Sequence, residues 1–203
     1  MNVAIFGATG ATGSRFCRRA LDAGHQITPF SFRRTEIAGV SEIQSTPIDL
    51  TNSTAIRQAL EGVDVVVSAI GGENSSRYTG IAALVQAAQA QQITRIIAVG
   101  GAGILDFPAG GILKEQPFFP AFLIPISDAH QAALEQLKQS TIDWTMICPG
   151  TMSDGHSNGN YRHQASQVLP DMKGVLYDDV AHLMLRSAQE ELYLRQRVSI
   201  SNP

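Results

Sequence analysis

A glycine-rich stretch near the start of the chain limits its fold more than any other feature. Residues 3–6 (VAIF) form an apolar run that is too short for a helix and is typical of a buried strand. Gly7, Gly10 and Gly13 follow with the spacing G-x-x-G-x-x-G, and residues 15–21 then carry a helical pattern. The sequence therefore predicts a strand, a tight turn and a helix in immediate succession.

This turn has the properties of a phosphate-binding site. Glycines let the backbone turn sharply and approach a ligand closely, and the unpaired N–H groups at the start of a helix attract an anion. The alternative is a strand-to-helix turn that binds nothing. A strand before the glycines and a helix after them favour the phosphate site.

The end of the second expected strand, residues 26–30, indicates which dinucleotide would bind. In dinucleotide-binding folds this point lies about 20 residues past the glycine turn, where an acid favours NAD and an arginine accommodates the extra phosphate of NADP. Arg33 and Arg34 come before the first acid, Glu36. A guanidinium binds a phosphate with two hydrogen bonds, so NADPH is favoured. The alternative is a solvated pair of surface arginines.

Strands and helices alternate along the rest of the chain. This order predicts an α/β fold, a Rossmann-like doubly wound parallel sheet of about seven strands with about six helices, in a single NAD(P)-binding domain over residues 1–203. Helix starts are expected at Asn52 or Ser53 and at Ser127 or Asp128. The expected later strands cover residues 43–48, 64–68, 95–99, 144–148 and 197–200, and the last helix covers 178–188.

A long loop follows the expected strand 95–99. Residues 102–126 are rich in Pro, Gly and Phe, and loops of this length are usually functional when they are ordered. Its aromatic side chains are expected either to line a pocket for a flat, conjugated substrate or to pack together as a small separate core. They are Phe107, Phe118, Phe119 and Phe122.

Composition excludes several classes of protein. The 203 residues have a net charge of −3 with both signs interspersed, so no nucleic-acid partner is expected. Cys17 and Cys148 are too few for a disulfide framework, which fits a reducing compartment. Met1 leads directly into the first strand, and no apolar run approaches the length of a membrane span. We therefore expect a cytoplasmic protein with no membrane partner.

The reactive side chains offer no familiar catalytic set. Short-chain dehydrogenases usually carry Tyr-x-x-x-Lys, but none of Tyr78, Tyr161, Tyr177 and Tyr193 is followed by a lysine four residues later. Chemistry that removes a hydroxyl proton is therefore disfavoured. The five histidines are scattered without the spacing of a zinc site, so no metal is expected. His130 is interpreted as a packing or surface residue of its helix, and Cys148 as a small buried side chain.

Four segments resemble the atypical short-chain dehydrogenases with an NAD(P)H-binding fold, and within them the biliverdin-IXβ reductase (NADPH flavin reductase) family. They are residues 7–13 (GATGATG), 68–71 (SAIG), 127–130 (SDAH) and 144–150 (WTMICPG) followed by Asp154. The tail YDDVAHLMLR at 177–186 extends the likeness over nearly the whole chain. The resemblance implies a monomeric, NADPH-dependent reductase of flavins (FMN, FAD, riboflavin) and biliverdin-type linear tetrapyrroles.

The resemblance also implies the cofactor contacts by position. The diphosphate would lie at Gly7, Thr9, Gly10, Ala11, Thr12 and Gly13, the 2′-phosphate at Arg33 or Arg34, and the adenine edge at Asp49 and Leu50. The ribose would lie beside Ser68, Ala69, Ile70 and Gly71, and the nicotinamide between Val99, Gly100 and Gly101 on one side and Pro149, Gly150, Thr151 and Met152 on the other.

The chain departs from the family on the substrate side. Gly101 stands where the family commonly has a serine, Thr151 stands near the place of a histidine, and Phe122 roughly replaces a basic residue. The expected substrate-binding positions are therefore Gly101, Phe122 and Thr151, with no catalytic side chain assigned. Two other functions remain open: an NAD(P)H quinone reductase, and an NADPH-sensing regulator of the NmrA-like kind that binds the nucleotide without turnover.

Overall fold

A computed structural model describes residues 1–71 and 74–203, with the side chains of 74–78 left aside. The main sheet has eight strands in the order β3-β2-β1-β4-β5-β6-β10-β8, in which only the edge strand β8 is antiparallel to its neighbour. Its strands are β1 (Asn2–Phe6), β2 (Gln26–Ser31), β3 (Thr46–Pro47), β4 (Val65–Ser68), β5 (Arg95–Val99), β6 (Asp143–Pro149), β8 (Arg162–Ala165) and β10 (Gln196–Ser201).

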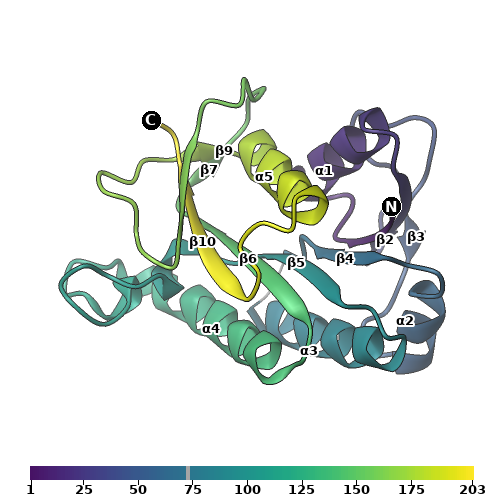
Figure 1. Cartoon of the computed structure of the whole chain (residues 1–203), viewed down its shortest axis with the longest axis horizontal. Coiled ribbons are helices and arrows are strands. Elements are labelled where there is room, and N and C mark those ends of the chain that lie inside the picture. Colours follow the sequence, from purple (N-terminus) through teal and green to yellow (C-terminus); the bar gives the residue numbers. More distant parts are fainter. Residues whose placement is uncertain (72–73) are drawn as a thin grey trace.

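Helices cover both faces of this sheet (Figure 1). Helices α1 (Ala11–Asp22) and α5 (Tyr177–Gln189) lie on one face, and α2 (Ser53–Ala59), α3 (Asn74–Ala90) and α4 (Ile124–Gln139) lie on the other. Side chains of β1 alternate accordingly, because Val3 and Ile5 join the core beside α1 and α5, whereas Ala4 and Phe6 join the opposite core. The doubly wound α/β fold expected from the sequence is confirmed.

Four strands, β3, β7, β8 and β9, differ from the sequence expectation of about seven. Strand β8 was not predicted, because its residues RHQA are polar and only half buried at the sheet edge. The third strand is limited to Thr46–Pro47, shorter than the expected 43–48. A separate two-stranded sheet pairs β7 (Met152–Ser153) with β9 (Val175–Leu176).

Of the two helix starts expected from the sequence, one is confirmed and the other is wrong. Asn52 caps α2, because its side-chain oxygen accepts a hydrogen bond from the backbone N–H of Ala55 at 3.0 Å. Helix α4 begins earlier than Ser127 or Asp128, at Ile124 with a proline in its first turn. Proline is favoured there because the first helical N–H groups need no partner within the helix. Among the described residues, no helix is long and apolar enough to cross a membrane.

Candidate active site

The glycine turn joins β1 to α1 and packs on the end of β4. Gly7 has a left-handed φ of +87°, and a Cβ on it would lie 2.4 Å from the backbone oxygen of Ala69. A Cβ on Gly13 would lie 2.1 Å from the oxygen of Gly7. Both positions exclude a side chain, so the start of α1 sits directly over the carboxyl end of the sheet.

The first turn of α1 is open toward solvent. Gly10 is the N-cap, no side chain caps the helix, and Gly10 and Ala11 are exposed. Uncapped N–H groups at a helix start are a ready anion site. This turn also lies where the strand order reverses between β1 and β4, the point at which open α/β sheets bind ligands. The residues here fit the diphosphate of a dinucleotide.

The end of β2 is bonded directly to the glycine turn. The backbone N–H groups of Gly7 and Ala8 both donate to the oxygen of Phe30, at 2.9 and 3.0 Å. Arg33 and Arg34 follow and are exposed, and within the described part of the chain neither forms an ion pair. The Arg33 guanidinium lies 4.8 Å from the centre of the Phe32 ring. Two cationic side chains thus stand beside the expected ribose position.

The residues expected around the adenine and ribose also come together. Leu50 and Ile70 meet over Gly80 of α3, since a Cβ on Gly80 would lie 3.1 Å and 2.8 Å from their Cδ1 atoms. Asp49 accepts hydrogen bonds from the backbone N–H and hydroxyl of Thr51, at 2.9 and 2.8 Å, and these bonds lower its pKa. Strand register places Ser68 level with Phe6, so this group adjoins the glycine turn.

The expected nicotinamide position lies past β5 and β6. The N–H of Gly100 donates to the oxygen of Ile147 at 2.7 Å, which holds residues 99–101 beside residues 149–151. The N–H of Val175 donates to the oxygen of Thr151 at 2.9 Å and fixes the second segment. Both segments expected to flank the nicotinamide therefore lie together at the carboxyl edge of the sheet.

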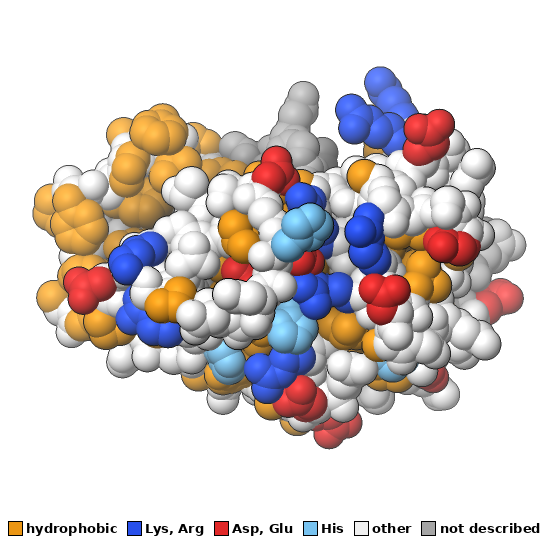
Figure 2. Space-filling view, turned by 90° about the horizontal axis from the view of Figure 1, so that it is seen from above, with side chains coloured by type: hydrophobic (Ala, Val, Ile, Leu, Met, Phe, Trp, Pro, Cys, Tyr) orange, Lys and Arg blue, Asp and Glu red, His pale blue; other side chains and the backbone are white. Residues whose placement is uncertain are grey.

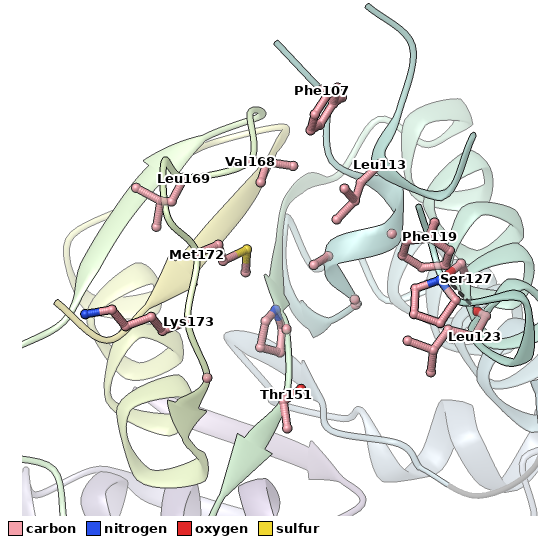
Figure 3. Close-up of a pocket in the computed structure, with 18 of the residues that line it drawn as sticks. Phe107, Leu113, Phe119, Leu123, Ser127, Thr151, Val168, Leu169, Met172 and Lys173 are labelled. Atoms are coloured by element: carbon pink, nitrogen blue, oxygen red, sulfur yellow. Dashed lines mark hydrogen bonds between the residues drawn. The ribbon is translucent and has the colours of Figure 1, made fainter. Parts of the chain in front are cut away.

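A cavity of about 870 Å³ opens at this edge. In Figure 3, Leu113, Phe119 and Leu123 form one wall, Val168, Leu169 and Met172 form the opposite wall, and Thr151 lies between them. Gly100, Gly101, Pro149 and Gly150 also line the cavity. Its charged lining residues are Asp171 and Lys173, and the Lys173 ammonium donates to the Pro203 oxygen at 2.5 Å. The cavity is therefore mainly apolar.

The loop of residues 102–126 forms much of the first wall, and its last three residues belong to α4. It contains the short 3₁₀ helices η1 (Ala102–Ile104), η2 (Leu113–Glu115) and η3 (Ala121–Leu123). Phe107, Phe118 and Phe119 line the cavity, but Phe122 is 81% exposed and does not. Figure 2 shows hydrophobic side chains gathered at the end of the molecule that carries this loop. The structure thus brings Gly101 and Thr151 together and leaves Phe122 outside.

His130 is a cavity residue that the sequence interpretation missed. It belongs to α4 and is 8% exposed, and it lines the cavity next to Gly101. A Cβ on Gly101 would lie 2.7 Å from its Nδ1 atom. The four-residue motif SDAH was a signal, but helical spacing with Ala133 and Leu137 indicated only packing.

Cys148 carries no reactive thiol. It is fully buried in β6, and burial raises its pKa to about 12. A thiol is nucleophilic only as the thiolate, so Cys148 is inert at neutral pH. Its interpretation as a small buried side chain is confirmed. Among the described residues, no cluster of His, Cys, Asp and Glu is arranged to hold a metal.

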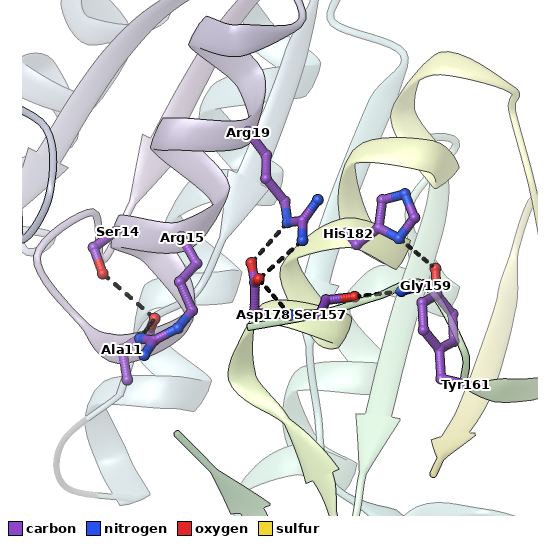
Figure 4. Close-up of polar contacts among 9 residues, drawn as sticks. All are labelled: Ala11, Ser14, Arg15, Arg19, Ser157, Gly159, Tyr161, Asp178 and His182. Atoms are coloured by element: carbon purple, nitrogen blue, oxygen red, sulfur yellow. Dashed lines mark hydrogen bonds and ion pairs between the residues drawn. The ribbon is translucent and has the colours of Figure 1, made fainter. Parts of the chain in front are cut away.

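An ion pair joins α1 to α5, and the segment after β7 is hydrogen-bonded to the same carboxylate (Figure 4). Arg19 of α1 donates two hydrogen bonds, at 2.7 and 2.9 Å, to the carboxylate of Asp178 on α5. The N–H of Ser157 donates to the same carboxylate at 2.8 Å. Arg15 donates to Asp154 at 2.8 Å. These contacts hold α1, α5 and residues 154–157 together.

The strand order, the glycine turn and the cavity at the carboxyl edge define a dinucleotide-binding domain of the Rossmann type. The chain belongs to the NAD(P)H-binding family, whose profile matches residues 7–191.

Three individual proteins are similar to this chain. A solved structure from Burkholderia pseudomallei, named as a candidate exported protein, is 30% identical, covers 99% of both chains and superposes with a TM-score of 0.89. A candidate NADH-flavin reductase from Streptococcus pneumoniae is 24% identical over 100% of both chains, with a TM-score of 0.85. A 2-alkyl-3-oxoalkanoate reductase from Shewanella oneidensis is 26% identical over 59% of this chain, but the match spans only 34% of that relative's length.

Proposed function

We propose that this protein is an NADPH-dependent reductase that transfers a hydride to a flat, conjugated acceptor, with flavins (FMN, FAD or riboflavin) favoured over biliverdin-type linear tetrapyrroles. The observation that supports it most is the apolar cavity that adjoins Gly100, Gly101 and Thr151, where the nicotinamide is expected. When bound, NADPH supplies the hydride, and the protein supplies binding and orientation.

The choice of NADPH over NADH rests on Arg33 and Arg34. Both side chains are exposed beside the glycine turn, and the Ser31 hydroxyl donates to the oxygen of Arg34, which fixes the backbone there. A guanidinium in this position matches a phosphate on the ribose. No carboxylate precedes them after β2 to bind the ribose hydroxyls of NADH instead.

The chemistry suits an acceptor that needs little acid or base assistance. The cavity wall contains no Tyr-x-x-x-Lys pair, and its reactive groups are few. Holding two reactants about 3–3.5 Å apart in a fixed orientation accounts for several kcal/mol of rate enhancement without proton transfer. A flavin or a quinone accepts a hydride under those conditions.

The cavity lining favours a flat, weakly charged ring system. Phe107 and Phe118 lie with their ring centres 5.5 Å apart, and both line the cavity with Phe119. Aromatic side chains stack on conjugated rings. The ammonium of Lys173 is the one cationic group among the described lining residues, and it already contacts Pro203. The cavity therefore offers few cationic groups to pair with the two propionate groups of a tetrapyrrole.

A quinone reductase is the second candidate, because the same apolar walls accept an uncharged quinone. An assay that monitors NADPH oxidation through the loss of NADPH absorbance discriminates a flavin reductase from a quinone reductase. We expect the purified protein to oxidise NADPH with FMN or riboflavin. Oxidation of NADPH with quinones but not with flavins would show that the protein is a quinone reductase. Tight NADPH binding without oxidation by any acceptor would contradict a reductase and favour a nucleotide-sensing regulator.

A further inference from the structure

One wall of the cavity continues outside the cavity as an exposed apolar surface. Residues 117–125 (PFFPAFLIP) contain no polar side chain, yet seven of these nine residues are exposed. Phe118 is 66% exposed, Phe122 81% and Ile124 39%. Figure 2 shows hydrophobic side chains gathered at this end of the molecule. Residues 117–125 thus form an apolar rim.

The apolar rim and the cavity share side chains. Four residues of the rim also line the cavity, namely Phe118, Phe119, Pro120 and Leu123. Phe119 and Leu123 belong to one cavity wall in Figure 3. Phe118 is exposed and also lines the cavity, with its ring centre 5.5 Å from that of Phe107. Apolar surface therefore runs from the cavity to the outside of the molecule.

Contacts within the loop hold the apolar rim against the cavity. The backbone N–H of Phe119 donates to the oxygen of Gln116 at 2.9 Å. A Cβ on Gly103 would lie 3.1 Å from Cζ of Phe119, so this ring packs on η1, just past the end of β5. The rings of Phe118 and Phe122 remain at the surface. The fold therefore maintains an exposed apolar surface at the cavity mouth.

The charged residues beside the apolar rim do not favour a charged occupant. Lys114 is the cation nearest to the rim in the sequence, and its ammonium lies 2.7 Å from the carboxylate of Asp128, with the side chain only 15% exposed. Glu115 adds a negative charge next to it. Contiguous exposed apolar surface usually marks a binding site. Because this surface continues into an acceptor cavity, its best match is an uncharged apolar chain on the acceptor itself.

We propose that the cavity takes, besides flavins, quinones that carry an apolar alkyl or prenyl chain, with the quinone ring in the cavity and the chain on the apolar rim. This inference rests on the proposed function. Reduction of the quinone uses the hydride of NADPH and one proton from water, and it gives the hydroquinone and NADP⁺. The chain takes no part in this step. Its burial adds affinity, so it lowers KM and leaves kcat nearly constant.

A series of para-benzoquinones with methyl, pentyl and decyl chains tests this contact. Full burial of one methylene group raises affinity by about fourfold, and we expect about twofold for each methylene on an open rim. The KM should therefore fall by about tenfold from the methyl to the pentyl compound, and further to the decyl compound. Calorimetric titration of the same quinones without NADPH should give the same order of affinities.

Substitution of Phe122 tests the rim without changing the cavity lining, because this side chain does not line the cavity. We expect Phe122→Ser to raise the KM for the decyl compound by about fivefold and to leave those for the methyl compound and riboflavin unchanged. Phe122→Leu keeps an apolar side chain and should retain most of the chain effect. Leu194→Ser, which removes an exposed apolar side chain between α5 and β10, is the matched control. Thermal melts establish that each variant is folded.

Equal KM values and equal affinities across the quinone series, with an active wild type, would overturn the proposal. Size-exclusion chromatography and sedimentation with phosphatidylcholine vesicles test two other apolar occupants. A dimer or a vesicle complex that Phe122→Ser abolishes, without any effect of chain length, would assign the rim to that partner instead.

Failure of the wild type to oxidise NADPH with any flavin or quinone would contradict the proposed function. The calorimetric titrations would then still decide whether an apolar chain binds the rim, because they need no NADPH.

Discussion

The carboxylate of Asp106, in the loop that forms one cavity wall, is bound by the guanidinium of Arg197 on β10. The Nη2 atom of Arg197 lies 2.8 Å from both carboxylate oxygens, and its Nη1 atom donates to the oxygen of Ile104. The Arg197 side chain is only 14% exposed, against 44% for Asp106. Strand β10, which lies next to the edge strand β8, thus holds the start of the loop in place.

We expect Asp106→Asn to loosen this wall without affecting the cofactor half. The KM for the acceptor should rise several-fold, while the dissociation constant for NADPH stays constant. Because Asp106 is half exposed, the loss of unfolding free energy should be about 1 kcal/mol, which lowers Tm by about 2–4 °C. Glu190→Ala, which breaks the Arg186–Glu190 pair on α5, is the matched control. An unchanged acceptor KM would contradict the anchoring role.

Removing both arginines after β2 should change the choice of nucleotide. We expect Arg33→Ala with Arg34→Ala to raise the KM for NADPH tenfold or more and to leave the KM for NADH nearly unchanged, because only NADPH carries the extra phosphate. Lys138→Ala, which removes an exposed cation on α4, should alter neither. Steady-state assays with both nucleotides decide the matter, and equal changes for NADPH and NADH would disprove the phosphate contact.

Thiol reagents should leave the proposed reductase activity unchanged. Burial raises the pKa of both Cys17 and Cys148 to about 12, so each is a protonated, enclosed thiol near neutral pH. We expect a native sample at pH 8 to show almost no labelling, and two thiols per chain to react after unfolding. Rapid labelling of Cys148 in the native protein, with loss of activity, would contradict this prediction and show that the end of β6 is accessible to the reagent.

Stability should depend on pH through two histidines on the α5 side of the sheet. Burial, with Arg186 nearby, lowers the pKa of His163, and burial with Arg19 nearby lowers that of His182. Nδ1 of His163 lies 2.6 Å from the Tyr193 hydroxyl, and Nδ1 of His182 lies 3.2 Å from the Tyr161 hydroxyl.

The unfolded chain takes up protons at these histidines near pH 6.5, before the folded chain does. The Tm should therefore fall as pH drops below about 6.5, and the decline from these groups should end once the folded histidines are also protonated. His163→Gln with His182→Gln should flatten the decline, and His156→Gln at an exposed site should not. Identical pH profiles for the wild type and the double variant would count against this origin.

The sequence predicted those features that depend on local pattern. Strand β5 was predicted at its observed bounds, because a run of apolar residues is typical of a strand buried on both faces. The glycine turn was predicted because glycines at this spacing are typical of a tight turn between a strand and a helix. Strand β8 was not predicted, because a polar edge strand lacks the apolar pattern. The start of α4 was placed too late, because Ser127 is a residue type that is common at helix N-caps.

The substrate side of the site depends on contacts between distant residues. His130 meets Gly101 only because α4 packs beside the end of β5, and helical spacing alone cannot distinguish a cavity histidine from a packing one. The sequence also cannot distinguish Phe122 from the phenylalanines that line the cavity, although Phe122 is exposed to solvent. The expected cofactor positions lie along one sheet edge, and their roles remain predictions.

The most direct test of the account is calorimetric titration of NADPH into the wild type, Gly13→Ala and Gly24→Ala. A Cβ at position 13 would lie 2.1 Å from the Gly7 oxygen, whereas one at position 24 would meet no atom within 4 Å and strains only a left-handed residue. We predict one NADPH bound per chain by the wild type and by Gly24→Ala, and no measurable binding by Gly13→Ala. Absence of heat with the wild type, or unchanged binding by a folded Gly13→Ala, would contradict a dinucleotide site at the glycine turn.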